Sequence, residues 1–215
     1  LYRKFGPDVR FFVAVDRKSL DLNDIAIACG NWLTVTGEQY KCSELIGWNC
    51  VERRNLALLE AVKWGADVIV TIDDDNIPIV PDYFVFAERL QAGEDGFFSG
   101  LCASSPSGWF DPGHLLVPQV THRGMPLDLP EAIYEPVVAA RIGVAQCLCL
   151  GDPDVSAVTR IAKAPIVHSV SELGRAGVVT DPRKTWTVMN TQNTAFIREL
   201  APAMFQPPGV GRYSD

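Results

Sequence analysis

The chain has 215 residues, of which 47% are hydrophobic and 21% charged, a composition typical of an ordinary folded domain. Its formal net charge of −7 argues against general nucleic-acid binding, which requires a basic surface. The sequence contains no apolar run of about 18 residues or more, so it predicts no membrane span. The first residues lack the apolar core of a signal peptide. Together these features predict a cytoplasmic protein and leave its oligomeric state open.

Strands and helices alternate in the first half of the predicted structure. The strands are expected at 10–16, 67–72 and 96–102, and the helices at 53–64 and 83–91. The first helix has apolar residues at helical spacing and ends at Gly65, a typical helix stop. Residues 104–130 are rich in Pro, Gly and Ser, which predicts irregular chain with at most short strands.

The second half of the chain is more mixed. Residues 132–140 suit a helix or a strand, and the later elements are expected as a strand at 144–150, a short helix at 155–161, extended chain at 188–196 and a helix at 198–205. The alternation in the first half predicts an α/β fold with a mostly parallel, Rossmann-like central sheet. We expect one domain, 1–215, with a nucleotide-binding half (1–103) and a sugar and acceptor half (104–215), truncated at both ends.

The most informative motif is the acidic run of Asp73, Asp74 and Asp75, which follows the apolar strand. Adjacent carboxylates repel one another, so we expect a cation beside them. Asp73 and Asp75 flank one residue and point to the same side of an extended backbone, so both can reach one metal ion. Mg²⁺ or Mn²⁺ suits these hard oxygen ligands and leaves positions for phosphate oxygens. Asp74 would point away, toward a backbone amide or a ribose. The alternative for the whole run is an acidic loop or a helix start.

Three further candidates for substrate binding lie in the first half. Asp16 ends a predicted strand, at the sheet edge where open α/β sheets bind ligands, and is expected to hold a uracil or ribose or to cap a turn. Arg54 and Asn55 begin the first helix, where they contact a base or diphosphate or belong to a solvated helix start.

Asp152 and Asp154 flank Pro153 after a predicted strand. They are candidates for binding sugar or acceptor hydroxyls, and an Asp-Pro turn is the alternative. Asn193 is a candidate for binding a sugar hydroxyl. The alternative is an asparagine at a strand end whose side chain forms its hydrogen bonds with the backbone. Six cysteines form no C-x-x-C pair, so we expect reduced, structural thiols and no zinc site.

Five segments share a pattern with known proteins: VTIDDD (70–75), FDP (110–112) with RGMPL (123–127), PDVSA (153–157), NTAFIRELAPAM (193–204) and GRYSD (211–215). In this order they resemble the reversibly glycosylated polypeptide family, which includes UDP-arabinopyranose mutases, and related GT-A glycosyltransferases. The resemblance implies a GT-A fold, the metal at the acidic run and a nucleotide-sugar donor. It also implies a place near the sugar for Asp215, which with Asp154 is a candidate catalytic base.

The chain departs from the family at two places. Ser156 stands where the family usually has Asp, and residues 164–169 lack the arginine associated with self-glycosylation. We therefore expect a metal-dependent glycosyltransferase that transfers sugar from a nucleotide sugar, expected to be a UDP-sugar, to an unknown external acceptor. The alternatives are a UDP-pentose pyranose/furanose mutase and a non-catalytic nucleotide-sugar or carbohydrate binder. A nucleotidyltransferase would need a Gly-rich basic phosphate loop, which is not seen in the sequence.

Overall fold

The computed structural model describes residues 9–17, 19, 32–73, 75–80, 83–91, 97–163 and 166–209. Of these, the residues within 9–70, 75–91 and 195–209 form a first compact unit, and those within 71–73 and 97–194 form a second. The division between the units falls inside β3 (Val68–Ile72) and β12 (Asn193–Ile197). The units do not coincide with the expected halves 1–103 and 104–215.

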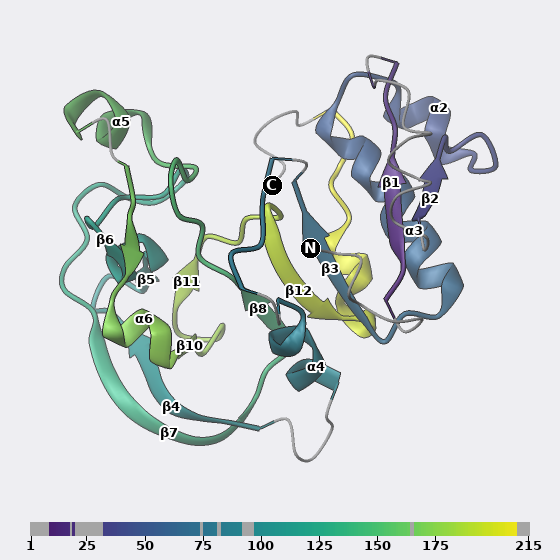
Figure 1. Ribbon diagram of the computed structural model, residues 1–215. Coiled ribbons are helices and arrows are strands. Elements are labelled where there is room, and N and C mark those ends of the chain that lie inside the picture. Colours follow the sequence, from purple (N-terminus) through teal and green to yellow (C-terminus); the bar gives the residue numbers. More distant parts are fainter. Residues whose placement is uncertain are drawn as a thin grey trace. The chain divides into compact units, whose positions relative to one another are not determined.

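In the first unit, helix α3 (Arg54–Trp64) packs against the parallel pair of β1 (Phe11–Ala14) and β2 (Trp32–Val35) (Figure 1). Leu56 of α3 is fully buried in a core with Val35 and Ile46. The helix ends at Gly65 with a φ of 90°, a left-handed conformation that favours glycine, so the predicted stop is confirmed. Among the described residues of this unit, further helices are α2 (Cys42–Ile46), η2 (Val51–Arg53), α4 (Val85–Gln91) and η5 (Arg198–Met204).

The second unit contains the most extensive strand pairing that the structure describes. Strand β4 (Phe97–Ser104) pairs antiparallel with β7 (Ile133–Arg141), and the two form a long curved ribbon in Figure 1. On the other edge of β4 lies β10 (Val178–Thr180), in parallel. The shorter elements are β5 (Trp109–Phe110) paired with β11 (Trp186–Thr187), β6 (Leu116–Val117) paired with β9 (Ser169–Val170), and the helices η4 (Pro112–Leu115), α5 (Ala157–Lys163) and α6 (Glu172–Ala176).

A third sheet has the strand order β3–β12–β8, with β8 at Val144–Gln146. Thr71 donates its hydroxyl hydrogen to the carbonyl oxygen of Thr194 over 3.2 Å. The amide of Cys147, just after β8, donates to the carbonyl oxygen of Asn193 over 2.9 Å. Residues 71–73, 146–149 and 190–194, widely separated in the sequence, are therefore neighbours within the second unit.

The expected fold class, a GT-A fold with a mostly parallel central sheet, is wrong. The described strands are divided among five sheets of two or three strands each, and the most extensive pairing is antiparallel. A parallel sheet needs long crossover connections, usually helices that cover its faces. The described chain from 97 to 156 contains no α-helix, so it does not supply such crossovers.

Most expected elements are nevertheless present. The structure confirms the helix at 53–64 and the strand at 67–72, and it makes 132–140 a strand rather than a helix. The predicted strand at 144–150 is shorter, because only residues 144–146 are paired as a strand. Within the described residues, no helix is both long and apolar enough to cross a bilayer.

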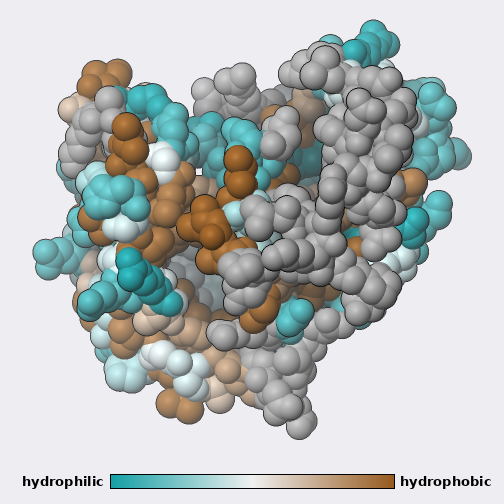
Figure 2. Space-filling model, in the orientation of Figure 1, coloured by the Kyte–Doolittle hydropathy of each residue, from teal (hydrophilic) through white to brown (hydrophobic). Residues whose placement is uncertain are grey.

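Hydrophobic side chains are exposed around α5 in the second unit. Val158, Ile161 and Ile166 are 54%, 87% and 75% exposed, and brown surface is visible over the α5 region in Figure 2. None of these residues lines the pocket of the second unit described below.

Candidate functional site

A small pocket opens on the second unit beside the end of β8. It is lined by residues from 146–149, by Pro153 and Asp154, by residues of the turn 190–193, and by His122. The pocket is small and partly open to solvent. Asp154 and Asn193, two of the residues singled out in the sequence, both line it.

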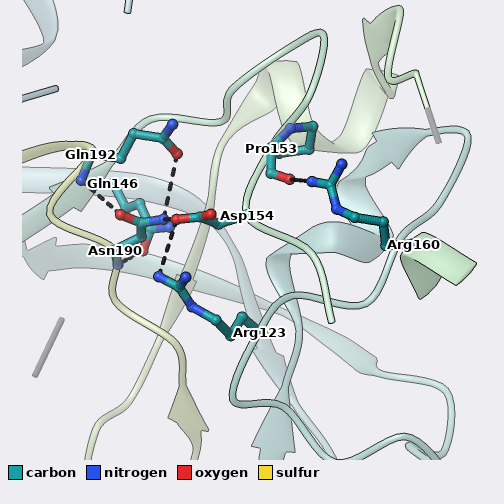
Figure 3. A network of polar contacts seen from close by, with 7 residues as sticks. All are labelled: Arg123, Gln146, Pro153, Asp154, Arg160, Asn190 and Gln192. Atoms are coloured by element: carbon teal, nitrogen blue, oxygen red, sulfur yellow. Dashed lines mark hydrogen bonds and ion pairs between the residues drawn. The ribbon is translucent and has the colours of Figure 1, made fainter. Parts of the chain in front are cut away.

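Asp154 is the centre of a polar network at this pocket (Figure 3). Its Oδ2 atom accepts hydrogen bonds from Arg123 NH2 over 3.2 Å and from Asn190 Nδ2 over 3.1 Å. The backbone amide of Gln192 donates to Asn190 Oδ1 over 2.7 Å. The backbone amide of Asn190 donates to Gln146 Oε1 over 3.4 Å. The Asp154 side chain is 38% exposed, so a ligand can reach it. A carboxylate surrounded by side-chain amides suits a ligand that carries several hydroxyl groups.

Backbone pairing holds Arg123 beside Asp154. His122 and Val155 form an antiparallel bridge, the Arg123 amide donates to the Asp154 carbonyl oxygen over 3.2 Å, and the Ser156 amide donates to the Thr121 carbonyl oxygen over 2.8 Å. The guanidinium and the carboxylate therefore project from adjacent paired segments. This explains why the RGMPL and PDVSA segments, which are distant in sequence, contribute to one site.

The first residue of the acidic run is connected to the same network. The backbone amide of Asp73 donates to the carbonyl oxygen of Gln192 over 3.0 Å. From Gln192, hydrogen bonds continue through Asn190 to Asp154. Within the second unit, the end of β3 thus lies directly beside the turn that lines the pocket.

The other members of the acidic run are less defined. Asp74 lies outside the described residues, as does Asp215, the second candidate base. Asp75 is exposed and accepts a hydrogen bond from Asn76 Nδ2 over 3.3 Å; it belongs to the first unit, whereas Asp73 belongs to the second. Binding of the metal and the substrate by this acidic run therefore stays a prediction.

The predicted metal fits the donor chemistry but has no complete ligand set in the described part of the chain. No group of three His, Cys, Asp or Glu residues that could hold a metal ion occurs there. Mg²⁺ commonly uses only one or two carboxylates and completes its shell with water and substrate phosphates. Asp73 and Asp75 meet that requirement by residue type, so metal binding stays a prediction.

Asp152 and Asp16 are not among the residues that line the pocket. Asp152 forms an exposed ion pair with Arg160 at 2.7 Å, and the hydrogen bond from that guanidinium lowers the pKa of the Asp152 carboxyl. Asp16, in the first unit, accepts hydrogen bonds at Oδ1 from the backbone amides of Arg17 and Asn49, at 2.8 and 2.7 Å. Asp16 therefore makes the contacts of a turn-capping residue, the alternative left open from the sequence.

Arg54 and Asn55 also belong to the first unit. Asn55 is 1% exposed, and both ends of its amide bond the backbone of Gln206, with Nδ2 donating to the carbonyl oxygen over 2.7 Å and Oδ1 accepting from the amide over 2.9 Å. This pairing connects α3 to the segment after η5. Arg54 is the first residue of α3 and does not line the pocket of the second unit.

The neighbouring Arg53 is a buried structural residue that the sequence pattern did not distinguish from Arg54. Its guanidinium donates to the carbonyl oxygens of Val15, Thr36 and Gly47 over 2.7, 2.7 and 2.9 Å. It also lies 3.8 Å from the centre of the Trp48 ring, a cation–π contact. These contacts connect the ends of β1, β2 and α2 in the first unit.

Sequence reasoning did not assign a role to the pair of Asp111 and His122, which the structure buries beside the pocket. Asp111 is fully buried and His122 is 6% exposed, and Oδ1 of the former lies 2.7 Å from Nδ1 of the latter. The Asp-Pro-Gly sequence after β5 was a usable signal, because Asp before such a turn typically caps it. In the structure Asp111 does cap η4 by accepting from the Gly113 amide over 2.8 Å.

The cysteines at the pocket are poor candidates for chemistry. Burial raises the pKa of the Cys147 thiol to about 12, and the nearby Cys149 adds to the rise. A thiol that stays protonated at neutral pH is a weak nucleophile and a weak metal ligand. The reactive groups of the pocket are therefore its carboxylate, its amides and its imidazole.

Comparison of the chain with models of known protein families found no match, and comparison with curated proteins found none either. The resemblance of the five segments to nucleotide-sugar enzymes is therefore a hypothesis.

Proposed function

We propose that this protein transfers sugar from a nucleotide sugar, a UDP-sugar by preference, to an external acceptor, with a divalent cation as cofactor. The observation that carries the proposal is the line of hydrogen bonds from Asp73 through Gln192 and Asn190 to Asp154. This line of hydrogen bonds supports the proposal because it connects Asp73, the first residue of the acidic run, to a pocket lined by a carboxylate and side-chain amides. A diphosphate and its sugar need these two features side by side.

Each part of the site has a role in this proposal. Asp154 and Asn190 bind sugar hydroxyls, as acceptor and donor, and Arg123 orients the Asp154 carboxylate through its hydrogen bond to Oδ2. Asp73 and Asp75 hold Mg²⁺ or Mn²⁺. When bound, the cation would neutralise the charge that develops on the departing diphosphate.

The transfer itself involves one bond formed and one broken at the anomeric carbon. The acceptor oxygen bonds to that carbon while its bond to the diphosphate oxygen breaks, and the electron pair leaves with the nucleoside diphosphate. The acceptor hydroxyl gives up its proton to a base of the protein. Asp154, at the pocket, and Asp215 are the base candidates that the sequence supplies. A cytoplasmic location remains part of the same proposal.

Calorimetric titration tests the donor and metal requirements together. UDP should bind wild type in the presence of Mn²⁺ and far more weakly without it, and Asp75→Asn should remove the Mn²⁺ dependence. Asp154→Asn should leave UDP binding unchanged but weaken UDP-glucose, UDP-galactose or UDP-arabinose, because the lost contacts are to sugar. GDP-, ADP- and dTDP-sugars serve as competitors for the base preference.

Asp128→Asn is the matched control, since Asp128 is an exposed carboxylate of the second unit that does not line the pocket. Equal UDP affinity with and without Mn²⁺, in wild type and Asp75→Asn alike, would contradict the metal site. Sugar binding without UDP release in the presence of any acceptor would instead indicate a non-catalytic binder. Stable labelling of the polypeptide by radiolabelled UDP-sugar would favour the mutase alternative.

A further inference from the structure

The pocket contains a histidine whose orientation is determined by a buried carboxylate. Asp111 accepts the backbone amide of His122 at Oδ2 over 2.9 Å and contacts His122 Nδ1 with Oδ1 over 2.7 Å. The side chains of Asp111 and His122 are 0% and 8% exposed. His122 is thus held to Asp111 through its backbone amide and its ring at once.

Gly113 lies close to both side chains and to the backbone of Val120. A Cβ atom at this position would lie 2.9 Å from His122 Nδ1 and 3.0 Å from Asp111 Oδ1, and closer still to the carbonyl oxygen of Val120. A larger residue would therefore clash with the Val120 backbone as well as with the ring and the carboxylate.

The contact with Asp111 also determines which ring nitrogen is available. An ionised carboxylate only accepts hydrogen bonds, so Nδ1 carries a proton and donates it to Asp111. In the neutral ring, Nε2 then has a free lone pair. His122 lines the pocket, and within the described residues no hydrogen bond involves Nε2. A neutral imidazole with a free Nε2 at a ligand pocket is a proton acceptor ready for use.

We propose that His122, positioned by Asp111, is the general base of the pocket and takes the proton of the acceptor hydroxyl. This inference rests on the proposed function, and it assigns the role of proton acceptor to His122 instead of Asp154. The acceptor O–H bond breaks, its proton goes to Nε2, and the oxygen lone pair forms the new bond to the anomeric carbon. Asp154 then serves to bind hydroxyl groups, because both of its described side-chain contacts converge on Oδ2.

Several titratable or charged groups surround the imidazole. Those on the elements that line the pocket or pair with residues 121–123 are Asp111, Arg123, Cys147, Cys149 and Asp154. Cys147 stays protonated at neutral pH because burial raises its pKa to about 12.

The test compares His122→Asn with wild type, using the UDP-sugar and acceptor that give the highest turnover. Asparagine retains a donor close to Nδ1 for Asp111 and removes Nε2. We expect kcat to fall by about a hundredfold or more while KM changes less than about threefold. His168→Asn, at an exposed histidine that does not line the pocket, is the matched control and should leave both kcat and KM unchanged.

A second measurement does not depend on the variant folding. In wild type, the NMR signal of the His122 ring should shift when the UDP-sugar and acceptor are added. A ring signal that does not change when these ligands are added would overturn the inference. Turnover by His122→Asn within about threefold of wild type would overturn it too, and would leave the proposed function standing. Absence of UDP-sugar binding and turnover in wild type would instead remove the proposed function, and the base role with it.

Discussion

Replacement of Asp111 by alanine should strongly destabilise the second unit as well as release His122. The Asp111 carboxylate is fully buried and accepts hydrogen bonds from the Gly113 amide, the His122 amide and His122 Nδ1 at 2.8, 2.9 and 2.7 Å. Alanine has no acceptor, so all three donors would be left without their partner in a water-poor environment.

The magnitude follows from these contacts. A buried donor that loses its partner costs about 1–3 kcal/mol, and charged acceptors lie toward the upper end. Taking about 1–2 kcal/mol for each of the three donors gives about 3–6 kcal/mol, which is comparable with the whole stability of many domains. Asp111→Asn should cost less, because its amide oxygen can still accept from one side.

Urea denaturation followed by circular dichroism would measure the loss, and amide hydrogen exchange would locate it. Exchange at the His122 amide should accelerate in Asp111→Ala beyond the general change in stability. Asp128→Ala provides the same chemical change at an exposed carboxylate and should alter the free energy of unfolding by less than about 0.5 kcal/mol. A loss below about 1 kcal/mol in Asp111→Ala would refute the reasoning, because it would mean that the donors find other partners.

Three further outcomes are expected. Burial and the hydrogen bond to Glu60 raise the pKa of Tyr40 from 10.0 to about 12, so the folded state keeps this proton longer than the unfolded chain. The resulting stabilisation is complete below pH 10 and is lost as the pH rises toward about 12. Tyr40→Phe should remove this alkaline dependence of the free energy of unfolding, measured in urea titrations. Tyrosinate absorbance that shows an ordinary pKa for Tyr40 would contradict the prediction. Arg53→Lys should lower the free energy of unfolding by about 2–4 kcal/mol, because lysine cannot serve all three backbone carbonyl oxygens, and a change below about 1 kcal/mol in urea titrations would disagree. Asn190→Ala should weaken UDP-sugar binding by about tenfold in calorimetry and leave UDP binding unchanged, because the substitution removes a contact to Asp154 at the sugar side. An equal loss of affinity for UDP and for the UDP-sugar would place Asn190 at the diphosphate instead.

The local elements were largely readable from the sequence. Apolar residues at helical spacing and the following Gly65 predicted α3, and the apolar run before the acidic triplet predicted β3, because both signals depend only on neighbouring residues. Asp154, a candidate from the sequence, lines the polar pocket, and its role in binding a ligand stays a prediction. Local pattern did not separate Arg53 from Arg54, because burial of one of two adjacent arginines is decided by distant carbonyl oxygens.

The sequence by itself therefore determined where α3 and β3 form and that an acidic run follows β3. Tertiary structure alone decided how the strands pair: β4 and β7 join antiparallel across nearly thirty intervening residues, and no short-range periodicity encodes that choice. It also decided that Asp111 meets His122 and that Asp73 meets Gln192, contacts between residues far apart in the chain. Periodicity reports which side of an element is buried, whereas the partner of a buried polar group depends on which segments the whole fold brings together.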